Sequence, residues 1–373
     1  MAATIKLCLV VSCALVLATA CHGLQIGYYK KTCPRAEALV RAEVKKAVRA
    51  NPGVGAGLIR MLFHDCFVEG CDASVLLDPT PSNPQPEKLG VPNNPSLRGF
   101  EVIDAAKAAV EKACPGTVSC ADIVAFAGRD ASYLLGHAKV SFHMPAGRLD
   151  GRKSLASETL TFLPGPSSNL SSLVSAFAAK GLSAEDVVVL SGAHSIGRSH
   201  CSSFAPARLS SQSDIAAPLA ALLRKQCPAN PATGASDPTV SQDVVSPDAL
   251  DNQYYKNVLA RKVLFASDAA LLSAPSTARM VRANARFPGS WEKKFAKAMV
   301  KMAAIGVKTA RDGEVWLLAQ MKNTYTSQRP VGGVEQGQHA AGLIIEISPR
   351  NQRRFLRMSE VMRTQTGVNA EAD

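Results

Sequence analysis

The segment Leu58-Ile-Arg-Met-Leu-Phe-His-Asp-Cys-Phe-Val-Glu-Gly-Cys-Asp-Ala-Ser74 combines a helical apolar pattern with reactive side chains. Arg60 and His64 stand at positions i and i+4, so on a helix both project from one face, with Phe63 beside them. A fixed cation next to a neutral imidazole suits a reaction in which the imidazole accepts a proton while the cation stabilises charge on the departing group. Such a pair by itself is more often a solvated helix surface, because both residue types are common on surfaces.

The end of this segment predicts a small loop that offers oxygen ligands to a cation. Cys66 and Cys71 can close a very small loop. Side-chain or carbonyl oxygens surround it at Asp65, Val68, Gly70, Asp72 and Ser74. Hard oxygen ligands on a constrained loop suit calcium. The alternative is an acidic turn facing solvent, which explains the carboxylates but gives no reason for the close cysteine pair.

A second motif is Val188-Val-Leu-Ser-Gly-Ala-His-Ser-Ile-Gly-Arg198, an apolar helix end followed by small residues. The small residues let a flat ligand come close to His194. A single histidine after an apolar run is usually a core or surface residue, so this motif gains its weight from the first one.

Outside these motifs, the spacing of apolar residues predicts helices over most of the chain. Apolar faces recur between residues 36 and 47 and between residues 102 and 110, and residues 170–179 and 291–305 supply further helical segments. Clear alternating runs joined by hairpin turns are missing. The expected fold class is mainly α.

Two helix starts are predicted at particular residues. Ser119 with Asp122, and Ser183 with Asp186, match the capping-box pattern with Asp in place of Glu, each before an apolar run. The sequence therefore predicts helices beginning just after Ser119 and Ser183.

The amino terminus predicts export. Lys6 precedes an apolar run from Leu7 to Val16, and small residues follow up to Ala20, which is the pattern of a secretory signal peptide. A membrane anchor would need about 20 unbroken apolar residues, and His22 ends this run too soon. We expect residues 1–23 to be the signal peptide and the rest to meet oxidising conditions.

The cysteines fit that compartment. After residue 23 there are seven: Cys33, Cys66, Cys71, Cys114, Cys120, Cys201 and Cys227. No pair has the C-x2-C spacing of a zinc finger, so a disulfide framework is the better interpretation. An odd number leaves one thiol outside the framework.

The formal net charge of +12 makes acidic polysaccharide a candidate partner. Nucleic acid is a poor candidate, because the chain has no basic block with interleaved aromatics in its main body. We expect no membrane partner, because no later apolar stretch could span a bilayer.

Together the two motifs resemble those of the secretory (class III) haem peroxidases of plants, over about Tyr28 to Val315. The resemblance implies a two-lobed, mainly helical fold with one haem b between a distal and a proximal lobe, and two calcium ions. It implies a monomer that reduces hydrogen peroxide to water and oxidises small phenolic donors in one-electron steps. The family roles are cell-wall and lignin phenol coupling, peroxide removal and stress response, in the cell wall or the vacuole.

On the distal side the resemblance gives His64 the role of acid and base, Arg60 that of the charge-stabilising arginine, and Phe63 that of the pocket wall. Asn93 matches the asparagine that hydrogen-bonds the distal histidine. Glu87 matches the glutamate linked through water to the distal calcium, whose ligands would be Asp65, Val68, Gly70, Asp72 and Ser74.

On the proximal side His194 matches the ligand of the haem iron and Asp268 its carboxylate partner. A second calcium would be held by Ser195, Asp243, Ser246, Ala249 (carbonyl) and Asp251. Pro164 matches the proline that faces aromatic donors, and Asn169 begins a glycosylation sequon.

The resemblance also implies a buried ion pair between Asp122 and Arg148. The implied disulfides are Cys33 with Cys114, Cys66 with Cys71, and Cys201 with Cys227.

The carboxyl end departs from the family pattern. After Val315 the family continues with basic residues and a cysteine that bonds to the position of Cys120, whereas this chain runs into Trp316-Leu-Leu-Ala-Gln. No cysteine follows Cys227, so Cys120 is the one left outside the three disulfides. We expect a peroxidase domain at 24–315 and a weakly structured tail at 316–373.

Two other functions stay open from the sequence. One is a protein of peroxidase fold that binds haem and calcium but is catalytically impaired by the altered tail. The other is a basic wall protein whose function is to bind polyanions.

Overall fold

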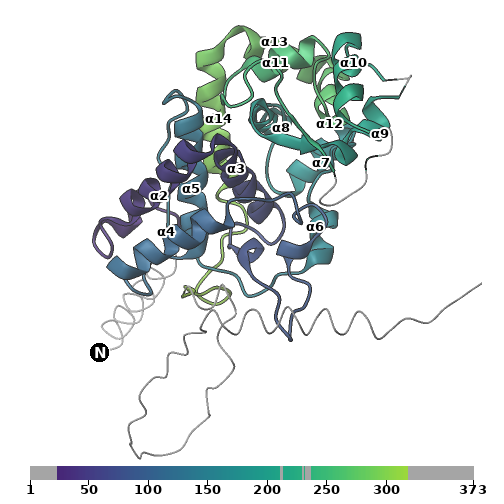
Figure 1. Cartoon of the computed structure of the whole chain (residues 1–373). Coiled ribbons are helices and arrows are strands. Elements are labelled where there is room, and N and C mark those ends of the chain that lie inside the picture. The colour runs from purple at the N-terminus through teal and green to yellow at the C-terminus, as the bar shows by residue number, and fades with distance from the viewer. Residues whose placement is uncertain (1–22, 211–212, 229–230, 232–236, 318–373) are drawn as a thin grey trace, which may run out of the picture. The chain divides into compact units, whose positions relative to one another are not determined.

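The computed structural model describes residues 23–210, 213–228, 231 and 237–317, which all fall within one compact unit (Figure 1). The expected signal peptide lies outside the described residues except for Gly23, and the expected tail lies outside them except for Trp316 and Leu317. Both remain predictions, as do the domain boundaries. Among the described residues, no helix is long and apolar enough to cross a membrane.

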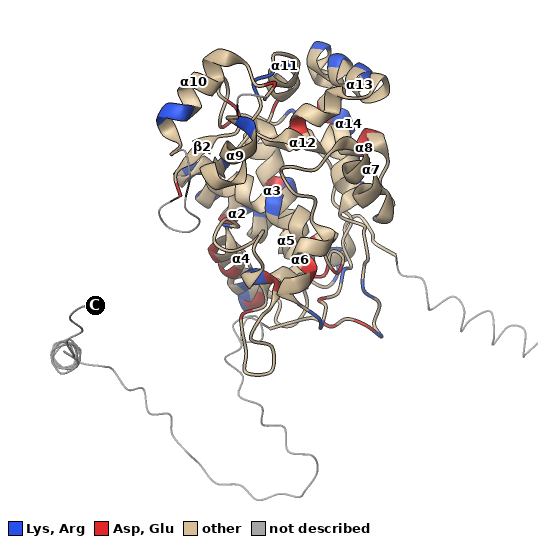
Figure 2. Cartoon of the chain, turned by 90° about the vertical axis from the view of Figure 1, so that its right-hand side faces the viewer, with Lys and Arg blue, Asp and Glu red and all other residues tan. Residues whose placement is uncertain are grey.

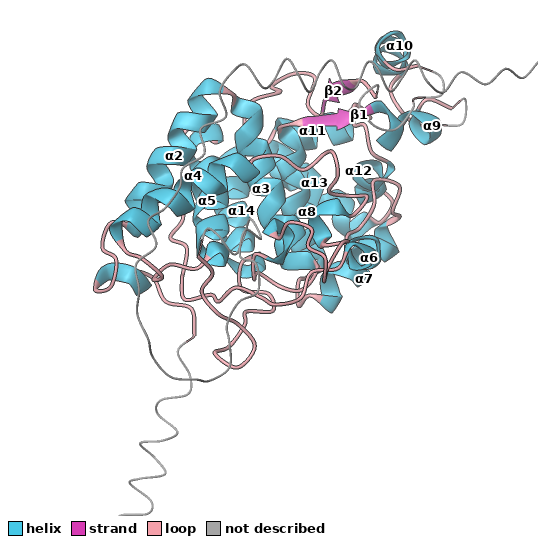
Figure 3. Cartoon of the chain, turned by 60° about the horizontal axis from the view of Figure 1, so that its bottom comes forward, coloured by secondary structure: helices cyan, strands magenta, loops and turns pink. Residues whose placement is uncertain are grey.

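Helices dominate the described chain, which confirms the mainly α class (Figure 3). The longer ones are α2 (Ala36–Ala50), α3 (Pro52–Phe67), α4 (Phe100–Ala113), α5 (Cys120–Leu135), α7 (Leu170–Ala179), α8 (Ala184–Ser191), α10 (Ala217–Gln226), α13 (Pro275–Arg286) and α14 (Pro288–Met302). Shorter α-helices are α6 (Ala156–Phe162), α9 (Ala205–Arg208), α11 (Gln253–Leu259) and α12 (Ala266–Ala269). Single 3-10 turns are η1 (Tyr28–Lys30), η2 (Ser74–Leu76), η3 (Glu87–Leu89), η4 (Gly192–Ser195), η5 (Cys201–Ser203) and η6 (Ala270–Leu272).

One small sheet was not expected from the sequence. Strands β1 (Arg198–His200) and β2 (Thr239–Ser241) pair antiparallel, with Ser199 opposite Val240. Each strand has three residues, which is too short for an alternating pattern to be recognised. The pairing joins the segment after His194 to the segment before Asp243.

Both predicted helix starts are confirmed, since α5 begins at Cys120 and α8 at Ala184, but only one of the two capping boxes is complete. At α8 the capping box forms, because Ser183 accepts from the amide of Asp186 and the Asp186 carboxylate accepts from the amide of Ser183. At α5 Ser119 caps the helix by accepting from the amide of Asp122 at 3.2 Å. The Asp122 carboxylate does not complete the box, because it bonds instead to Arg148 and to Tyr29.

Two groups of helices build the interior and together position the site (Figures 1 and 3). In one group, α5 packs against α3 and α2, and α4 packs against α2. In the other, α8 packs against α7, α13 and α14. A Cβ atom at Gly128 of α5 would lie 2.9 Å from Leu62 Cδ2 of α3, so glycine is needed where these two helices approach most closely.

Packing of α14 against α8 also fixes the turn that carries His194. The indole Nε1 of Trp291 donates to the carbonyl of Val189 at 3.2 Å. A Cβ atom at Gly192 would lie 2.7 Å from the same indole ring, so no side chain fits at that position. At Gly192, the small residue of the second motif therefore makes room for the indole of Trp291 and not for a ligand.

Three disulfides lie within the described part of the chain, and they are the pairs that the family resemblance implies. They are Cys33–Cys114, Cys66–Cys71 and Cys201–Cys227. Cys120 is fully buried at the start of α5 and belongs to none of them. Burial and the neighbouring carboxylate of Asp150 raise the pKa of its thiol well above the usual range.

Asp150 attaches the carboxyl-terminal segment to the start of α5. Its carboxylate accepts from the amides of Cys120 at 3.1 Å, Ala121 at 2.8 Å and Trp316 at 2.8 Å. Asp150 and Glu314 also form an antiparallel bridge. Burial raises the pKa of Asp150 to about 7, although the three amides oppose that rise. Trp316 is 3% exposed, so the packed domain includes it.

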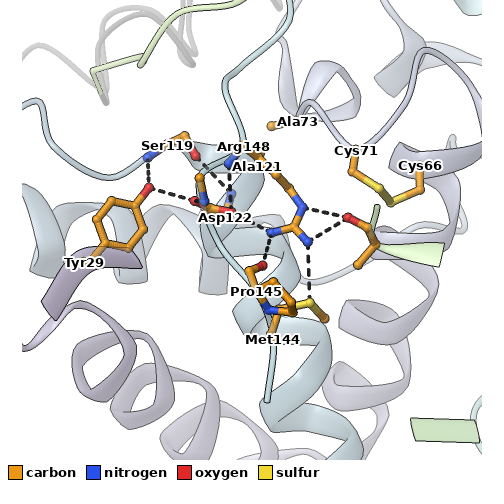
Figure 4. A network of polar contacts seen from close by, with 12 residues as sticks. Tyr29, Cys66, Cys71, Ala73, Ser119, Ala121, Asp122, Met144, Pro145 and Arg148 are labelled. Atoms are coloured by element: carbon orange, nitrogen blue, oxygen red, sulfur yellow. Dashed lines mark hydrogen bonds and ion pairs between the residues drawn. A yellow bond between two sulfur atoms is a disulfide. The ribbon is translucent and has the colours of Figure 1, made fainter. Parts of the chain in front are cut away.

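The ion pair of Asp122 and Arg148 lies at the centre of a buried polar network (Figure 4). Arg148 Nη1 is 2.6 Å from Asp122 Oδ1, and both side chains are fully buried. The guanidinium also donates to the carbonyls of Pro145 and Ala303. The other carboxylate oxygen of Asp122, Oδ2, accepts a hydrogen bond from the Tyr29 hydroxyl at 2.7 Å. These bonds join four segments that are distant in sequence.

Replacing Arg148 with Met should therefore cost about 3–5 kcal/mol of unfolding free energy, because Asp122 would keep a buried charge without its partner. Urea denaturation followed by circular dichroism measures this loss. The matched control is Arg152→Met, which breaks the pair of Arg152 and Glu314, whose side chains are 55% and 41% exposed. A control effect as large as that of Arg148→Met would contradict the argument.

Candidate functional site

Helix α3 carries the predicted distal residues on one face. His64 is 5% exposed, whereas Arg60 and Phe63 are half-buried. Arg60 Nη2 donates to the carbonyl of Pro92 at 2.7 Å, which fixes the guanidinium. Burial and the neighbouring Arg98 lower the pKa of Arg60 to about 10, so it remains a cation at neutral pH. The structure thus places a fixed positive charge beside a buried imidazole.

The tautomer of His64 is set by a direct hydrogen bond. Nδ1 of His64 lies 2.6 Å from Oδ1 of Asn93, whose Nδ2 donates to the carbonyl of Glu87 at 2.6 Å. Because the amide oxygen only accepts, Nδ1 carries the proton and Nε2 is left as a proton acceptor. Burial, and then the charge of Arg60, lower the pKa of His64 well below its usual value. The imidazole is therefore neutral at physiological pH.

The same network continues to the loop after α3 through a residue that the sequence did not indicate. The amide of Glu87 donates to Ser154 Oγ at 2.9 Å, and that hydroxyl donates to the carbonyl of Ser74 at 2.8 Å. Ser154 lies in a loop with no motif of its own, so no local signal could have identified it. Direct bonds thus connect His64 to the predicted calcium loop.

The oxygens of that loop fit a cation. Within the described residues several buried oxygens accept no hydrogen bond: Asp65 Oδ1, Ser74 Oγ and both carboxylate oxygens of Glu87. Such groups are costly in a protein interior unless a metal or a donor satisfies them. The described chain has no cluster of three or more His, Cys, Asp or Glu arranged for a metal. A calcium here would therefore need the hydroxyl and backbone oxygens as well.

Two lysines approach the same loop. Lys308 Nζ lies 3.2 Å from Asp72 Oδ2, and Lys180 Nζ donates to the carbonyl of Val68 at 2.9 Å. Burial, and then the charge of Asp72, raise the pKa of Asp65 well above its usual range. Burial, and then the charge of Asp65, raise the pKa of Glu87 to about 9. The positive charge of the two lysines is therefore not enough to keep all of these carboxyl groups ionised.

On the proximal side the structure joins the predicted His194 and Asp268. Nδ1 of His194 in η4 lies 2.8 Å from Oδ1 of Asp268 in α12, and the Asp268 side chain is 3% exposed. Burial lowers the pKa of His194, but the charge and hydrogen bond of Asp268 outweigh burial and raise it overall. The ring nitrogen that faces away from Asp268 is the one available to a metal.

Aromatic side chains hold both histidines. The His194 ring meets Tyr254 at 6.2 Å and Phe265 at 5.3 Å between centroids, edge to face in each case. On the distal side the ring of Phe63 lies 4.4 Å from that of Phe67, which in turn packs against Phe177 at 4.9 Å. No sequence motif indicated a role for Tyr254, Phe265 or Phe177.

The second predicted calcium set also comes together around one carboxylate. Asp243 Oδ1 accepts from the amides of Val245 at 2.6 Å and Ser246 at 3.0 Å, while its buried Oδ2 has no partner in the described chain. Ser246 Oγ donates to Asp251 at 3.4 Å, and the amide of Asp251 donates to Ser195 Oγ at 3.2 Å. Ala249 lies between Ser246 and Asp251 in the same loop.

The two halves of the site face each other closely enough to interact. The charge of Arg60 on α3 acts to lower the pKa of His194 in η4. The side chain of His194 is still 38% exposed although its Nδ1 is bound. An imidazole held from behind and open in front fits the ligand of a haem iron.

Two further predicted residues lie near this region at the surface. Pro164 is partly exposed in the loop between α6 and α7, and that loop is tied to α12 by the bond from the Ser267 amide to the carbonyl of Pro166 at 3.0 Å. Asn169 is exposed and caps α7 by accepting from the amide of Ser172 at 2.9 Å.

Comparison with known proteins agrees with this helical fold. A family model described as peroxidase matches residues 40–286. The chain is 64% identical over 306 residues to Peroxidase 2 of Zea mays, covering 81% of this chain and 91% of that protein. It is 48% identical over 354 residues to Peroxidase 1 of Zea mays, covering 91% and 95%. It is 44% identical over 296 residues to the lignin-forming anionic peroxidase of Nicotiana sylvestris, covering 79% and 89%.

This chain belongs to the peroxidase family, in the class III group of plant peroxidases. It is a haem-dependent enzyme that reduces hydrogen peroxide and oxidises phenolic donors. The family carries calcium in addition to haem.

The unsatisfied carboxyls give a pH-dependent prediction. Glu87 has an ordinary pKa of 4.5 and a folded, calcium-free pKa of about 9. Between these values the folded chain holds a proton that the unfolded chain has lost, so stability falls as pH rises. Calcium bound there would satisfy the ionised carboxylates and abolish this loss. We therefore expect the melting temperature of protein freed of calcium beforehand to lie further below that of the calcium-saturated protein at pH 8 than at pH 5; an equal difference at both pH values would contradict this expectation.

Proposed function

We propose that His194 holds the iron of one haem b and that His64 and Arg60 act on hydrogen peroxide in front of it. The observation that carries this proposal is the arrangement of the two histidines, each with Nδ1 bonded to a buried oxygen and the other nitrogen left open. When bound, haem supplies the redox-active iron and stores the two oxidising equivalents taken from peroxide.

His64 can move the proton that peroxide cleavage requires. Neutral Nε2 accepts the proton from one peroxide oxygen and returns it to the other, which then leaves as water. Asn93 keeps Nδ1 protonated throughout, so that Nε2 is always the nitrogen that exchanges the proton. Arg60, fixed by the carbonyl of Pro92, stabilises the negative charge that develops on the departing oxygen.

The proposed donors are small phenols that each give one electron near Pro164. Support comes from the partial exposure of Pro164 and from the relative that is named lignin-forming. We infer that this chain serves cell-wall phenol coupling, with peroxide removal and stress response as related roles. The proposed location is extracellular, in the cell wall or alternatively the vacuole, with a glycan at the exposed Asn169.

The proposed metal content is two calcium ions. The distal ion would be held by Asp65, Val68, Gly70, Asp72 and Ser74, with Glu87 acting through water. The proximal ion would be held by Ser195, Asp243, Ser246, Ala249 and Asp251. Support comes from the unpartnered buried oxygens at both places. The proximal set includes the residue after His194, so its ion would help to fix the turn that carries that ligand.

A catalytic function is favoured over an impaired peroxidase fold by the state of the carboxyl end. Although Cys120 is in none of the three disulfides, Trp316 remains attached to α5 through Asp150. The distal and proximal hydrogen bonds are also complete.

Stopped-flow absorption of the haem-loaded chain tests the assignment of the base. Mixing with one equivalent of peroxide should change the Soret band quickly, and a phenol should reverse the change. In His64→Leu the rate should fall by roughly 10²–10⁴, the usual contribution of a positioned general base, while haem stays bound. Phe177→Leu, which alters the packing behind Phe63 without removing a proton acceptor, is the control. A rate that barely changes in His64→Leu would show that another group is the base.

We also propose an acidic wall polysaccharide as a partner of the basic face formed by Arg279, Arg282 and Arg286 of α13. All three side chains are exposed, and none forms an ion pair within the described chain. The three arginines recur at helical spacing along one face of α13, where Figure 2 shows basic residues gathered. A row of unpaired cations suits a polyanion.

A triple variant in which Arg279, Arg282 and Arg286 are each replaced by Gln should bind polygalacturonate several-fold more weakly. Its binding should also depend less on salt, because fewer positive charges contact the polymer. Binding is measured by retention on immobilised polygalacturonate at increasing ionic strength. The control triple variant replaces Lys45, Lys46 and Arg49 of α2, which removes the same charge elsewhere. Equal losses in the two triple variants would show that net charge alone determines binding.

A further inference from the structure

The hydrogen-bonded pair of His194 and Asp268 has a third member, Tyr254, which takes no part in the proposed proton transfer. Tyr254 lies in α11 and is 2% exposed. Its hydroxyl donates to Asp268 Oδ1 at 2.6 Å. The same carboxylate oxygen lies 2.8 Å from His194 Nδ1. One oxygen of Asp268 therefore accepts from both the phenol and the imidazole.

We propose that Tyr254 is a positioning residue that limits how much negative charge Asp268 confers on His194. The inference rests on the proposed role of His194 as the iron ligand. A buried carboxylate that accepts a hydrogen bond from a metal-bound imidazole makes that imidazole a stronger electron donor. A second donor on the same oxygen stabilises part of the carboxylate's negative charge. The hydrogen bond from the imidazole to that oxygen is then weaker, and the Nδ1 proton stays closer to the imidazole.

The strength of the second bond is sufficient to matter. Hydrogen bonds with an ionised partner are about twice as strong as those between neutral groups. The short distance and the burial of both partners place the Tyr254 bond in this class. Without it, His194 would approach the anionic form and stabilise the oxidised state of a bound iron.

The neighbouring rings allow the hydroxyl to be removed alone. The Tyr254 ring packs edge to face on the rings of His194 and Tyr255, with centroid distances of 6.2 Å and 5.0 Å. Phenylalanine at position 254 keeps these contacts and the volume, and it loses only the donor.

Tyr255 provides a matched control in the adjacent position. Its hydroxyl is also buried, and it donates to the carbonyls of Val188 at 2.9 Å and Val189 at 3.1 Å. Tyr255→Phe therefore removes a buried tyrosine hydroxyl from the same helix without touching Asp268.

The test uses the full haem-loaded chain and two readouts other than turnover: the iron–histidine stretching frequency of the ferrous protein by resonance Raman, and the ferric/ferrous midpoint potential. In Tyr254→Phe the frequency should rise and the potential should shift to more negative values. We expect the ferric/ferrous equilibrium to change by about tenfold, which is about 59 mV for one electron. Tyr255→Phe should change neither quantity, although it should lower stability.

The outcomes separate this inference from the function on which it rests. An unchanged or lower frequency in Tyr254→Phe would overturn the role of Tyr254. Absence of an iron–histidine band in the unsubstituted protein would instead overturn His194 as the ligand. If Tyr254→Phe does not bind haem, Tyr254→Met removes the same donor with a side chain that adapts to the space, and the same two shifts are expected.

Discussion

Carboxylates buried away from water are the constraint on which most of this structure depends. An ionised carboxylate is costly in a protein interior unless it is paired, hydrogen-bonded or bound to a metal. Asp122 is satisfied by Arg148, Asp150 by three backbone amides, and Asp268 by an imidazole and a phenol. Each of these partners lies at least 14 residues away in the sequence and in another element, so the bonds that satisfy the charge also fix the tertiary arrangement.

The distal loop is the place where the described protein groups do not suffice. Asp65 and Glu87 keep oxygens without a hydrogen bond, and burial raises the pKa of both. The same loop is bonded through Ser154, Glu87 and Asn93 to His64. The oxygens that we propose bind a cation and the imidazole that we propose as the base are thus parts of one hydrogen-bond network, so a bound ion would affect proton transfer.

The carboxyl end shows how the fold accommodates a departure from its family. The segment up to Trp316 is held at the start of α5 by backbone hydrogen bonds to Asp150 and by burial of the indole. Cys120 lies at the same helix start, buried and outside the three disulfides. Noncovalent contacts therefore attach this segment where the family resemblance leads us to expect a covalent bond. The segment remains close to the Asp122 network, which supports both groups of helices.

The sequence by itself determined the features that depend on a few neighbouring residues: the helical class, the caps at Ser119 and Ser183, and the shared face of Arg60 and His64. The partners of the two histidines are 29 and 74 residues away, and family resemblance indicated them where no local pattern could. The same resemblance indicated the buried pair of Asp122 and Arg148, for which Asp122 leaves its capping box. Only the tertiary structure decided that Tyr254 would share the oxygen of Asp268. The physical reason is that backbone patterns are set locally, whereas a buried polar group takes the donor that packing of distant segments brings within reach.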